Sequence, residues 1–394
     1  MDAHAAQWLN LALRWMHVIT GVAWIGTSFY FNWLNSRLHA LAVPEPGVAG
    51  ELWSVHGGGF YRVLKYTVAP SRLPATLHWF KWEAYATWLS GFLLLTLIYY
   101  AGARAYLVDP AVANIGPLAA VGIGLATLLG AWLVYDALCR SPLGQRPTVL
   151  AGVGVVLIAA LAFGLTRVFS ARAAYMHVGA ALGTIMAANV WRVIIPGQQA
   201  MVAAMSAGKT PDAARGAAGA LRSLHNNYLT LPVLFVMVSG HYPATYGNAW
   251  GWAVLVGLFL IGVATRHWFN LRNQGTPNRW LLPAAVTGLV LLAVATAPRA
   301  PAATTSSPVE FAQVRVVIAQ RCAPCHSAAP TYPGFTAPQG GLALDTPDQM
   351  HAAAARILER AVTARTMPLG NLTGITDAER DLLGAWVRGG ASLR

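Results

Sequence analysis

Long apolar stretches dominate the hydropathy pattern of the chain. Each is close to the length of about 20 residues that a helix needs to cross the hydrocarbon core of a bilayer. The eight stretches are residues 10–33, 77–100, 115–138, 148–168, 172–194, 223–242, 249–271 and 280–297. Buried core helices of a soluble protein would explain one or two of them but not all. The pattern therefore predicts an all-α transmembrane bundle of eight spans over residues 1–297.

Beyond the last apolar stretch the pattern changes twice. Residues 298–308 (PRAPAATTSSP) predict a flexible linker, because they offer little to bury. Residues 309–394 have the composition of a small soluble domain. It begins with an amphipathic helix, EFAQVRVVIAQR, and ends with another, TDAERDLLGAWVRG, for which Thr376 and Glu379 predict a capping box. We expect this tail to be a separate all-α domain.

The composition fits a membrane protein and changes the meaning of the net charge. Hydrophobic residues make up 56% of the chain and charged residues 10%, against about a quarter charged in an average soluble protein. A net charge of +13 would suggest a nucleic-acid partner in a soluble protein. Here, residues 1–298 hold 18 basic against 7 acidic residues. We therefore expect membrane lipid and no nucleic acid as a partner.

The distribution of basic residues predicts the orientation. Thirteen of them, Arg222 and Arg266 included, fall in the loops after spans one, three, five and seven, and three fall in the other loops. Basic loops mark the cytoplasmic side. The first stretch lacks the basic flank and cleavage site of a secretory signal, so we expect it to stay as the first span. The chain is then a multi-pass protein of the bacterial inner membrane, with both termini in the periplasm.

The tail carries a C-x-x-C-H motif at Cys322, Cys325 and His326. This is the attachment signature of c-type haem, with two thiols for the haem vinyl groups and an adjacent imidazole for iron. A zinc or redox C-x-x-C site would need partners that the tail lacks, because no further cysteine follows. The motif predicts one covalent haem c in a class I-type cytochrome c domain.

The second axial ligand of this haem has three candidates by residue type. They are Met350, His351 and Met367. We favour Met367, which precedes a proline in an extended segment about 40 residues after the motif. Met350 and His351 lie at the start of a helical run and fit packing or surface roles better. Ligation by His and Met raises the reduction potential, which suits an electron acceptor.

Six histidines lie within or beside the predicted spans, in two layers. The outer layer consists of His17, His177 and His241, and the inner layer of His78, His225 and His267. Ionisable groups at membrane depth are costly and are usually functional. Imidazoles on neighbouring helices commonly hold haem b, so we hypothesise a haem b or other metal centre on His17 and His177. The further candidate ligands are His241 and His267. Alternatively, each histidine only hydrogen-bonds a neighbouring helix.

Other polar groups accompany the inner histidines. Trp79, Lys81 and Glu83 follow His78, whereas Asn226 and Asn227 follow His225. Arg62 closes the segment HGGGFYR, whose glycines would allow close approach to a ligand. Such groups would suit a flat, anionic, hydrogen-bonding heterocycle. Alternatively, Lys81 and Arg62 snorkel to the cytoplasmic surface and Trp79 belongs to an aromatic belt.

Several of these stretches resemble one known family. They are RWMHVITGVAWIGTSFYFNWLN, HGGGFYRVLKYTVAPSRLPATLHWFKWEAYATWLSG and HNNYLTLPVLFVMVSGHYPATYG, together with CAPCH and TMP in the tail. The chain resembles, over essentially its whole length, the integral-membrane urate oxidases (urate hydroxylases) with a fused C-terminal cytochrome c domain. The resemblance implies oxidation of urate to 5-hydroxyisourate without peroxide. The electrons would pass to cytochrome c and a terminal oxidase.

Roles for the inner residues follow as hypotheses. His78, His225 or Glu83 would act as the base that removes a proton from the substrate, and Lys81 would offset negative charge. The residues expected to contact the substrate are Asn226, Asn227, Trp79 and Arg62. Two other functions stay open at this point: a cytochrome bc-like quinol dehydrogenase with haem b in the membrane and haem c outside, and a purine transporter or redox sensor with a regulatory cytochrome. The oligomeric state is open as well.

Overall fold

The computed structural model describes residues 3–297, 309–333 and 335–394. The predicted linker, 298–308, lies outside the described residues. The helices and strands of residues 3–297 are α1 (Ala3–Ser36), β1 (Val48–His56), β2 (Gly59–Tyr66), α2 (Trp82–Leu95), η1 (Thr96–Tyr100), α3 (Ala103–Tyr106), α4 (Pro117–Arg140), η2 (Pro142–Gln145), α5 (Pro147–Leu165), α6 (Ala171–Asn189), η3 (Val190–Ile194), α7 (Ile195–Ser206), α8 (Ala213–Ser239), α9 (Pro243–Tyr246), α10 (Gly251–Asn273) and α11 (Leu281–Ala295).

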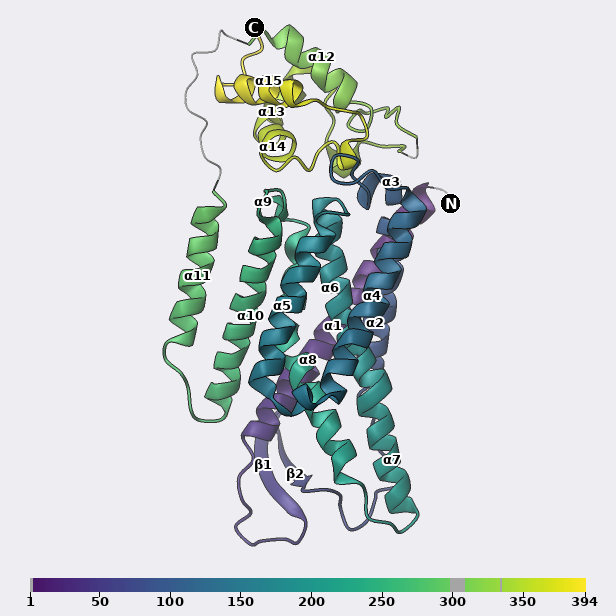
Figure 1. The fold of residues 1–394 in the computed structure, drawn as a ribbon, viewed down its shortest axis with the longest axis vertical. Coiled ribbons are helices and arrows are strands. Elements are labelled where there is room, and N and C mark those ends of the chain that lie inside the picture. The colour runs from purple at the N-terminus through teal and green to yellow at the C-terminus, as the bar shows by residue number, and fades with distance from the viewer. Residues whose placement is uncertain (1–2, 298–308, 334) are drawn as a thin grey trace.

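The chain is mostly helical, as the hydropathy pattern predicts, and its long helices form one elongated bundle (Figure 1). Among the described residues, four helices are long and apolar enough to cross a membrane. They are α4, α5, α10 and the continuous rod Ala171–Ser206, which joins α6, η3 and α7. Helix α11 is apolar but shorter. The other predicted stretches lie on α1, α2 with η1, and α8, where polar residues interrupt the apolar run.

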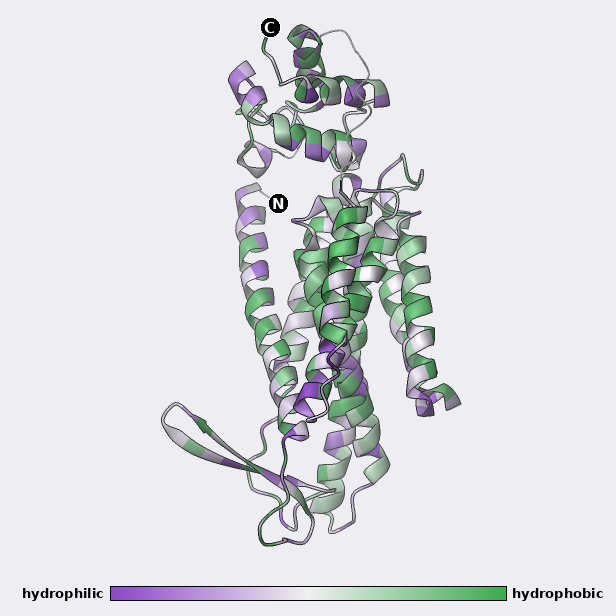
Figure 2. Ribbon diagram, turned by 90° about the vertical axis from the view of Figure 1, so that its left-hand side faces the viewer, coloured by the Kyte–Doolittle hydropathy of each residue, from purple (hydrophilic) through white to green (hydrophobic). Residues whose placement is uncertain are grey.

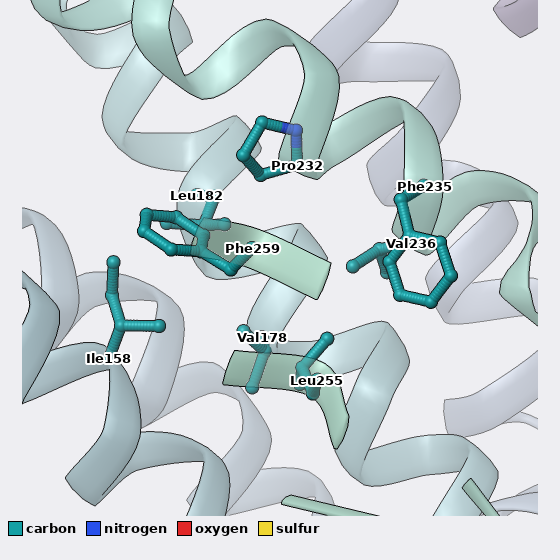
Figure 3. A pocket seen from close by; sticks show the side chains of 8 residues that line it. All are labelled: Ile158, Val178, Leu182, Pro232, Phe235, Val236, Leu255 and Phe259. Carbon is teal, nitrogen blue, oxygen red and sulfur yellow. The ribbon is translucent and has the colours of Figure 1, made fainter. Parts of the chain in front are cut away.

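The bundle wraps around α6, the helix with the most buried face. Gly179 on α6 lets α8 approach closely, since a Cβ at this position would lie 2.9 Å from Cβ of Val236. In the same way, a Cβ at Gly262 on α10 would lie 3.1 Å from Cδ of the Pro232 ring. Small residues at such crossings are how helices pack tightly in lipid. Near these contacts, apolar side chains of α5, α6, α8 and α10 enclose a cavity of about 10 Å³ (Figure 3).

A β-hairpin that the hydropathy pattern did not predict follows α1. Strands β1 and β2 pair antiparallel, with Leu52 opposite Val63, and Figure 2 shows the hairpin projecting from the lower end of the bundle. Gly57 and Gly58 form its turn with φ of 56° and 80°. Positive φ at both central positions is the geometry that a two-residue hairpin turn requires. These glycines therefore serve the turn, and their surroundings are open.

The C-terminal part forms a second helical unit with its own buried core. Its elements are α12 (Phe311–Arg321), η4 (Gln339–Gly341), α13 (Pro347–Ala352), α14 (Ala354–Ile357), η5 (Leu358–Thr363), η6 (Leu369–Asn371) and α15 (Asp377–Arg388). Helices α12 and α15 coincide with the two predicted amphipathic helices, and the predicted capping box of Thr376 and Glu379 is confirmed. Glu379 also pairs with Arg321 of α12 at 3.0 Å. Although desolvation raises the pKa of Glu379, its hydrogen bonds outweigh that effect and lower the pKa.

This unit lies against the end of the bundle opposite the hairpin (Figure 1). Gly370 is at the contact, because a Cβ there would lie 2.9 Å from the carbonyl oxygen of Val108. Similarly, a Cβ at Gly247 of the bundle would lie 2.6 Å from the carbonyl oxygen of Ala364. A cavity of about 70 Å³ remains between the two parts, and Met367 is one of the residues that line it.

Candidate active site

Polar side chains converge inside the bundle, towards its hairpin end. Helix α8 supplies them from two faces: Arg222, His225 and Asn226 lie on one face with helical spacing, and Asn227 points to the other. Figure 2 shows hydrophilic segments in the lower half of the bundle. We call these residues and their partners, described next, the inner polar layer. Buried polar groups at this depth need partners, so each contact is informative.

The first face of α8 meets α4 through a buried ion pair and α6 through a hydrogen bond. Arg222 Nη2 donates to Asp136 Oδ1 at 2.7 Å, and the two side chains are 4% and 12% exposed. Arg222 Nη1 also donates to Asn189 Oδ1 at 3.3 Å. The second oxygen of Asp136 accepts from Arg140, which lies mostly in solvent. The charge of Arg222 is therefore compensated inside the protein.

The same face continues into a neutral network. His225 Nδ1 lies 2.8 Å from the hydroxyl of Tyr135. Asn189 Nδ2 donates to that hydroxyl at 3.1 Å and to Asn226 Oδ1 at 2.9 Å. Cys139, one turn after Tyr135, places its sulfur 3.9 Å from His225 Nδ1. The network holds one nitrogen of His225 in place and leaves Nε2 for other partners.

The second face of α8 meets α10. Arg266 Nε donates to Asn227 Oδ1 at 3.0 Å, and Asn270 Nδ2 donates to the same oxygen at 3.1 Å. All three residues are at most 4% exposed. The guanidinium of Arg266 also lies over the ring of Phe29 on α1, 3.9 Å from its centroid. Helices α1, α8 and α10 thus meet around a buried cation.

The structure places the predicted residues around α2 at its inner end. His78 is exposed and packs edge-on against Phe80 before the helix begins. Trp79 packs against a small apolar cluster, and Lys81 Nζ lies 5.6 Å from the ring of Trp82, which is 68% exposed. Glu83, in the first turn, has a buried Oε2 without a hydrogen-bond partner. Of this group, Glu83 has the orphaned polar atom that a ligand would satisfy.

Arg62 lies on the projecting hairpin and away from the inner polar layer. Its Nε donates to Glu51 Oε2 at 2.6 Å, and its guanidinium lies 5.7 Å from the ring of Trp53. All of these are cross-strand contacts within the hairpin. The structure therefore gives Arg62 a local partner, and its role in binding a substrate stays a prediction.

Two of the three predicted outer histidines, His17 and His177, make their contacts at different heights in the bundle. His17 Nδ1 lies 3.0 Å from the carbonyl oxygen of Thr87 on α2. His177 is fully buried, with Nδ1 at 2.8 Å from the carbonyl oxygen of Ala173 and Nε2 at 3.3 Å from the hydroxyl of Tyr100. Each Nδ1 thus engages a carbonyl, as in many metal-ligating histidines. However, Thr87 and Tyr100 are separated by roughly 20 Å of helix at 1.5 Å per residue.

The remaining histidines of the predicted cofactor set lie apart as well. His241 is exposed at the end of α8, and His267 Nδ1 lies 2.7 Å from the hydroxyl of Tyr228. In the described part of the chain, no group of three or more His, Cys, Asp or Glu side chains could hold a metal ion. A haem b or metal on His17, His177, His241 or His267 stays a prediction.

The residues of the C-x-x-C-H motif have the chemistry that a c-type haem needs. Cys322 and Cys325 are free thiols at the end of α12. His326 Nδ1 lies 3.2 Å from the carbonyl oxygen of Leu342. An imidazole that donates from Nδ1 to a backbone carbonyl keeps Nε2 free for iron. These residues therefore fit the group.

The candidates for the second axial ligand differ in their surroundings. Met350 is 2% exposed in the core of the C-terminal unit, and His351 Nδ1 lies 2.9 Å from the carbonyl oxygen of Ala391. Both residues already have packing or hydrogen-bonding roles. Met367 lines the cavity beside the bundle, and Arg380 Nη1 donates to its carbonyl oxygen at 2.8 Å. No residue of the C-x-x-C-H motif lines this cavity, so ligation of the haem iron by Met367 stays a prediction.

The inner polar layer includes residues that sequence reasoning did not select. They are Tyr135, Asp136, Asn189, Arg222, Arg266 and Asn270. By their sequence positions, Arg222 and Arg266 fit loop residues that set the topology, yet both are 4% exposed. The spacing of Arg222 to Asn226 and of Arg266 to Asn270 places each pair on one face of a helix. That spacing was the available signal.

Comparison with known proteins places this bundle in a family. The family described as Urate oxidase N-terminal matches residues 3–297, which include the whole inner polar layer. No curated protein and no solved structure matches the chain. Since the match covers well over half of the chain, the chain belongs to the urate oxidase N-terminal family.

Proposed function

We propose that this chain is a membrane oxidoreductase that converts urate to 5-hydroxyisourate in the inner polar layer. Its electrons would pass through the bundle to a c-type haem in the C-terminal unit, and then to a respiratory cytochrome c and terminal oxidase. Family membership carries the urate part of this proposal, because the match spans the helices that build the layer. The motif at Cys322, Cys325 and His326 supports the choice of acceptor.

The reaction sets requirements that the inner polar layer meets. Urate and water give 5-hydroxyisourate, two protons and two electrons, so a base has to accept a proton near the substrate. His225 suits this role, since its Nδ1 is engaged by the Tyr135 hydroxyl at 2.8 Å and its Nε2 is left for a proton. Glu83, with its orphaned Oε2, is the second candidate. His78 is exposed, so it would act only on a substrate outside the buried layer.

The position of the C-terminal unit also supports its proposed role as electron acceptor. Cys322 and Cys325 would hold the haem covalently, and His326 and Met367 would ligate its iron. A haem with these ligands supplies a one-electron acceptor of raised potential. The C-terminal unit lies at the end of the bundle opposite the hairpin (Figure 1). With the basic loops in the cytoplasm, this end faces the periplasm, where c-type haem is attached.

The membrane setting rests on the surface as well as on the spans. Many large apolar side chains of the bundle are exposed, such as Leu118 at 89%, Val294 at 69% and Val156 at 66%. In a membrane, lipid chains would cover these side chains. We propose that all eight predicted stretches are in the membrane, with the inner polar layer towards the cytoplasm.

An anaerobic optical titration of the purified protein with urate tests the proposal. We expect urate to reduce a c-type absorption band, and 5-hydroxyisourate to accumulate in proportion. Ala substitution of His225 should slow this reduction strongly. The same substitution at His56, on the exposed hairpin, should leave it unchanged. Oxygen consumption with release of peroxide would contradict the proposed acceptor, and absence of urate turnover with any acceptor would contradict the proposed substrate.

A further inference from the structure

The bundle buries two arginines, and their electrostatic situations differ. Arg222 has its counter-ion in Asp136, as described above. Arg266 is equally buried, at 4% exposed, but in the described part of the chain no carboxylate lies within ion-pair distance of it. A buried charge without a counter-ion costs several kcal/mol. The Arg266 environment therefore favours binding of an anion.

The polar atoms around Arg266 define what kind of anion fits. Asn227 Oδ1 accepts from both Arg266 Nε and Asn270 Nδ2. These two bonds occupy the oxygen of Asn227 and the amide nitrogen of Asn270. Three buried atoms then have no hydrogen-bond partner: Arg266 Nη2, Asn227 Nδ2 and Asn270 Oδ1. These atoms are two donors, one of them cationic, and one acceptor. The three residues are hydrogen-bonded to one another across α8 and α10, so the three atoms belong to one cluster.

A simple anion would satisfy only part of this cluster. Chloride or a fully ionised phosphate accepts hydrogen bonds, and would leave Asn270 Oδ1 without a donor. An anionic oxo-heterocycle has carbonyl oxygens or a deprotonated nitrogen for the two donors, and a ring N–H for the acceptor. Phe29, 3.9 Å from the guanidinium, adds an aromatic ring beside the site. Urate as its monoanion has this pattern of groups.

We propose that Arg266, Asn227 and Asn270 form the subsite that binds the anionic edge of the oxopurine substrate. This inference rests on the proposed function for the identity of the substrate. Arg266 selects the charged form of the ligand. The amides of Asn227 and Asn270 fix how the ligand is oriented in the subsite. Arg222, on the opposite face of α8, keeps a structural role through Asp136.

Equilibrium binding of radiolabelled urate to the purified full-length protein tests this without turnover. Loss of a buried, charge-assisted contact costs about 2 kcal/mol or more, so Arg266→Gln should weaken urate binding by at least about 30-fold. Binding of xanthine, which is largely uncharged at neutral pH, should change far less. The matched control is Arg272→Gln, which removes an exposed charge from the same helix and should leave both affinities unchanged.

A second variant covers the case in which Arg266→Gln fails to fold. Asn270→Leu keeps a similar volume and removes the acceptor, and should weaken urate binding about 5-fold, the equivalent of one neutral hydrogen bond. Equal losses for urate and xanthine in Arg266→Gln would overturn the inference, and so would unchanged urate affinity in either variant. If wild-type protein binds urate but never oxidises it, the proposed function fails while the subsite is still tested. If it oxidises urate and the variants bind normally, only the subsite fails.

Discussion

Removing the negative charge of Asp136 should destabilise the bundle strongly. In Asp136→Asn the side chain keeps its size, but Arg222 becomes a buried cation without a counter-ion. Breaking a buried ion pair in this way costs about 3–5 kcal/mol, because the remaining charge cannot reach water: the Arg222 side chain is 4% exposed. The free energy of unfolding should fall by this amount, which is a factor of at least about 100 in the unfolding equilibrium.

The second partner of Asp136 provides the matched control. Arg140 donates to the other carboxylate oxygen at 2.6 Å, but its side chain is 67% exposed. An ion pair with one solvated member contributes about 0–1 kcal/mol, so Arg140→Gln should be nearly neutral. Replacing both buried partners, Asp136→Leu with Arg222→Leu, should cost less than Asp136→Asn alone, since no unpaired charge is left.

Reversible unfolding by SDS in mixed micelles, followed by far-UV circular dichroism, measures these differences. The buried-pair reasoning is refuted if Asp136→Asn lies within about 1 kcal/mol of wild type. It is also refuted if the double leucine variant is no more stable than Asp136→Asn. Either result would mean that Arg222 reaches water or another anion in the folded bundle.

Three further predictions concern other parts of the chain. Gly179→Ala should lower the free energy of unfolding by about 1–3 kcal/mol through overpacking against α8, whereas Gly183→Ala, with open space around it, should not; the same SDS titration decides. Cys322→Ala should abolish haem staining of the denatured chain on a gel, while Cys139→Ala, outside the motif, should keep it. Glu379→Gln should speed amide hydrogen exchange in α15 at neutral pH. The carboxylate has a lowered pKa in the folded unit, so it stabilises the fold at pH values above its ordinary pKa of 4.5. That difference should disappear as the pH falls through the lowered pKa, and a constant ratio at all pH values would contradict it.

Features that depend on neighbouring residues could be predicted from the sequence. The capping box at Thr376 and Glu379 is an example, since both partners lie within one turn of α15. The helical stretches are another, because a long apolar run favours a helix wherever it packs. The β-hairpin escaped prediction although His56-Gly57-Gly58-Gly59 is a turn signal. In the sequence, the same glycines also fit a loop that approaches a ligand, and only the pairing of β1 with β2 shows that they form a turn.

The sequence by itself determined which segments are helical and where the C-x-x-C-H motif lies, because both are encoded by residues close together in the chain. The tertiary structure alone decided which polar residues meet. Asp136 and Arg222 are 86 positions apart, and Asn227 and Arg266 are 39 apart. Their contacts depend on how α4, α8 and α10 rotate about their axes and cross one another. The sequence alone does not distinguish a basic residue near a helix end that faces the cytoplasm from one that faces the protein interior. The packing of the neighbouring helices decides which of the two it is.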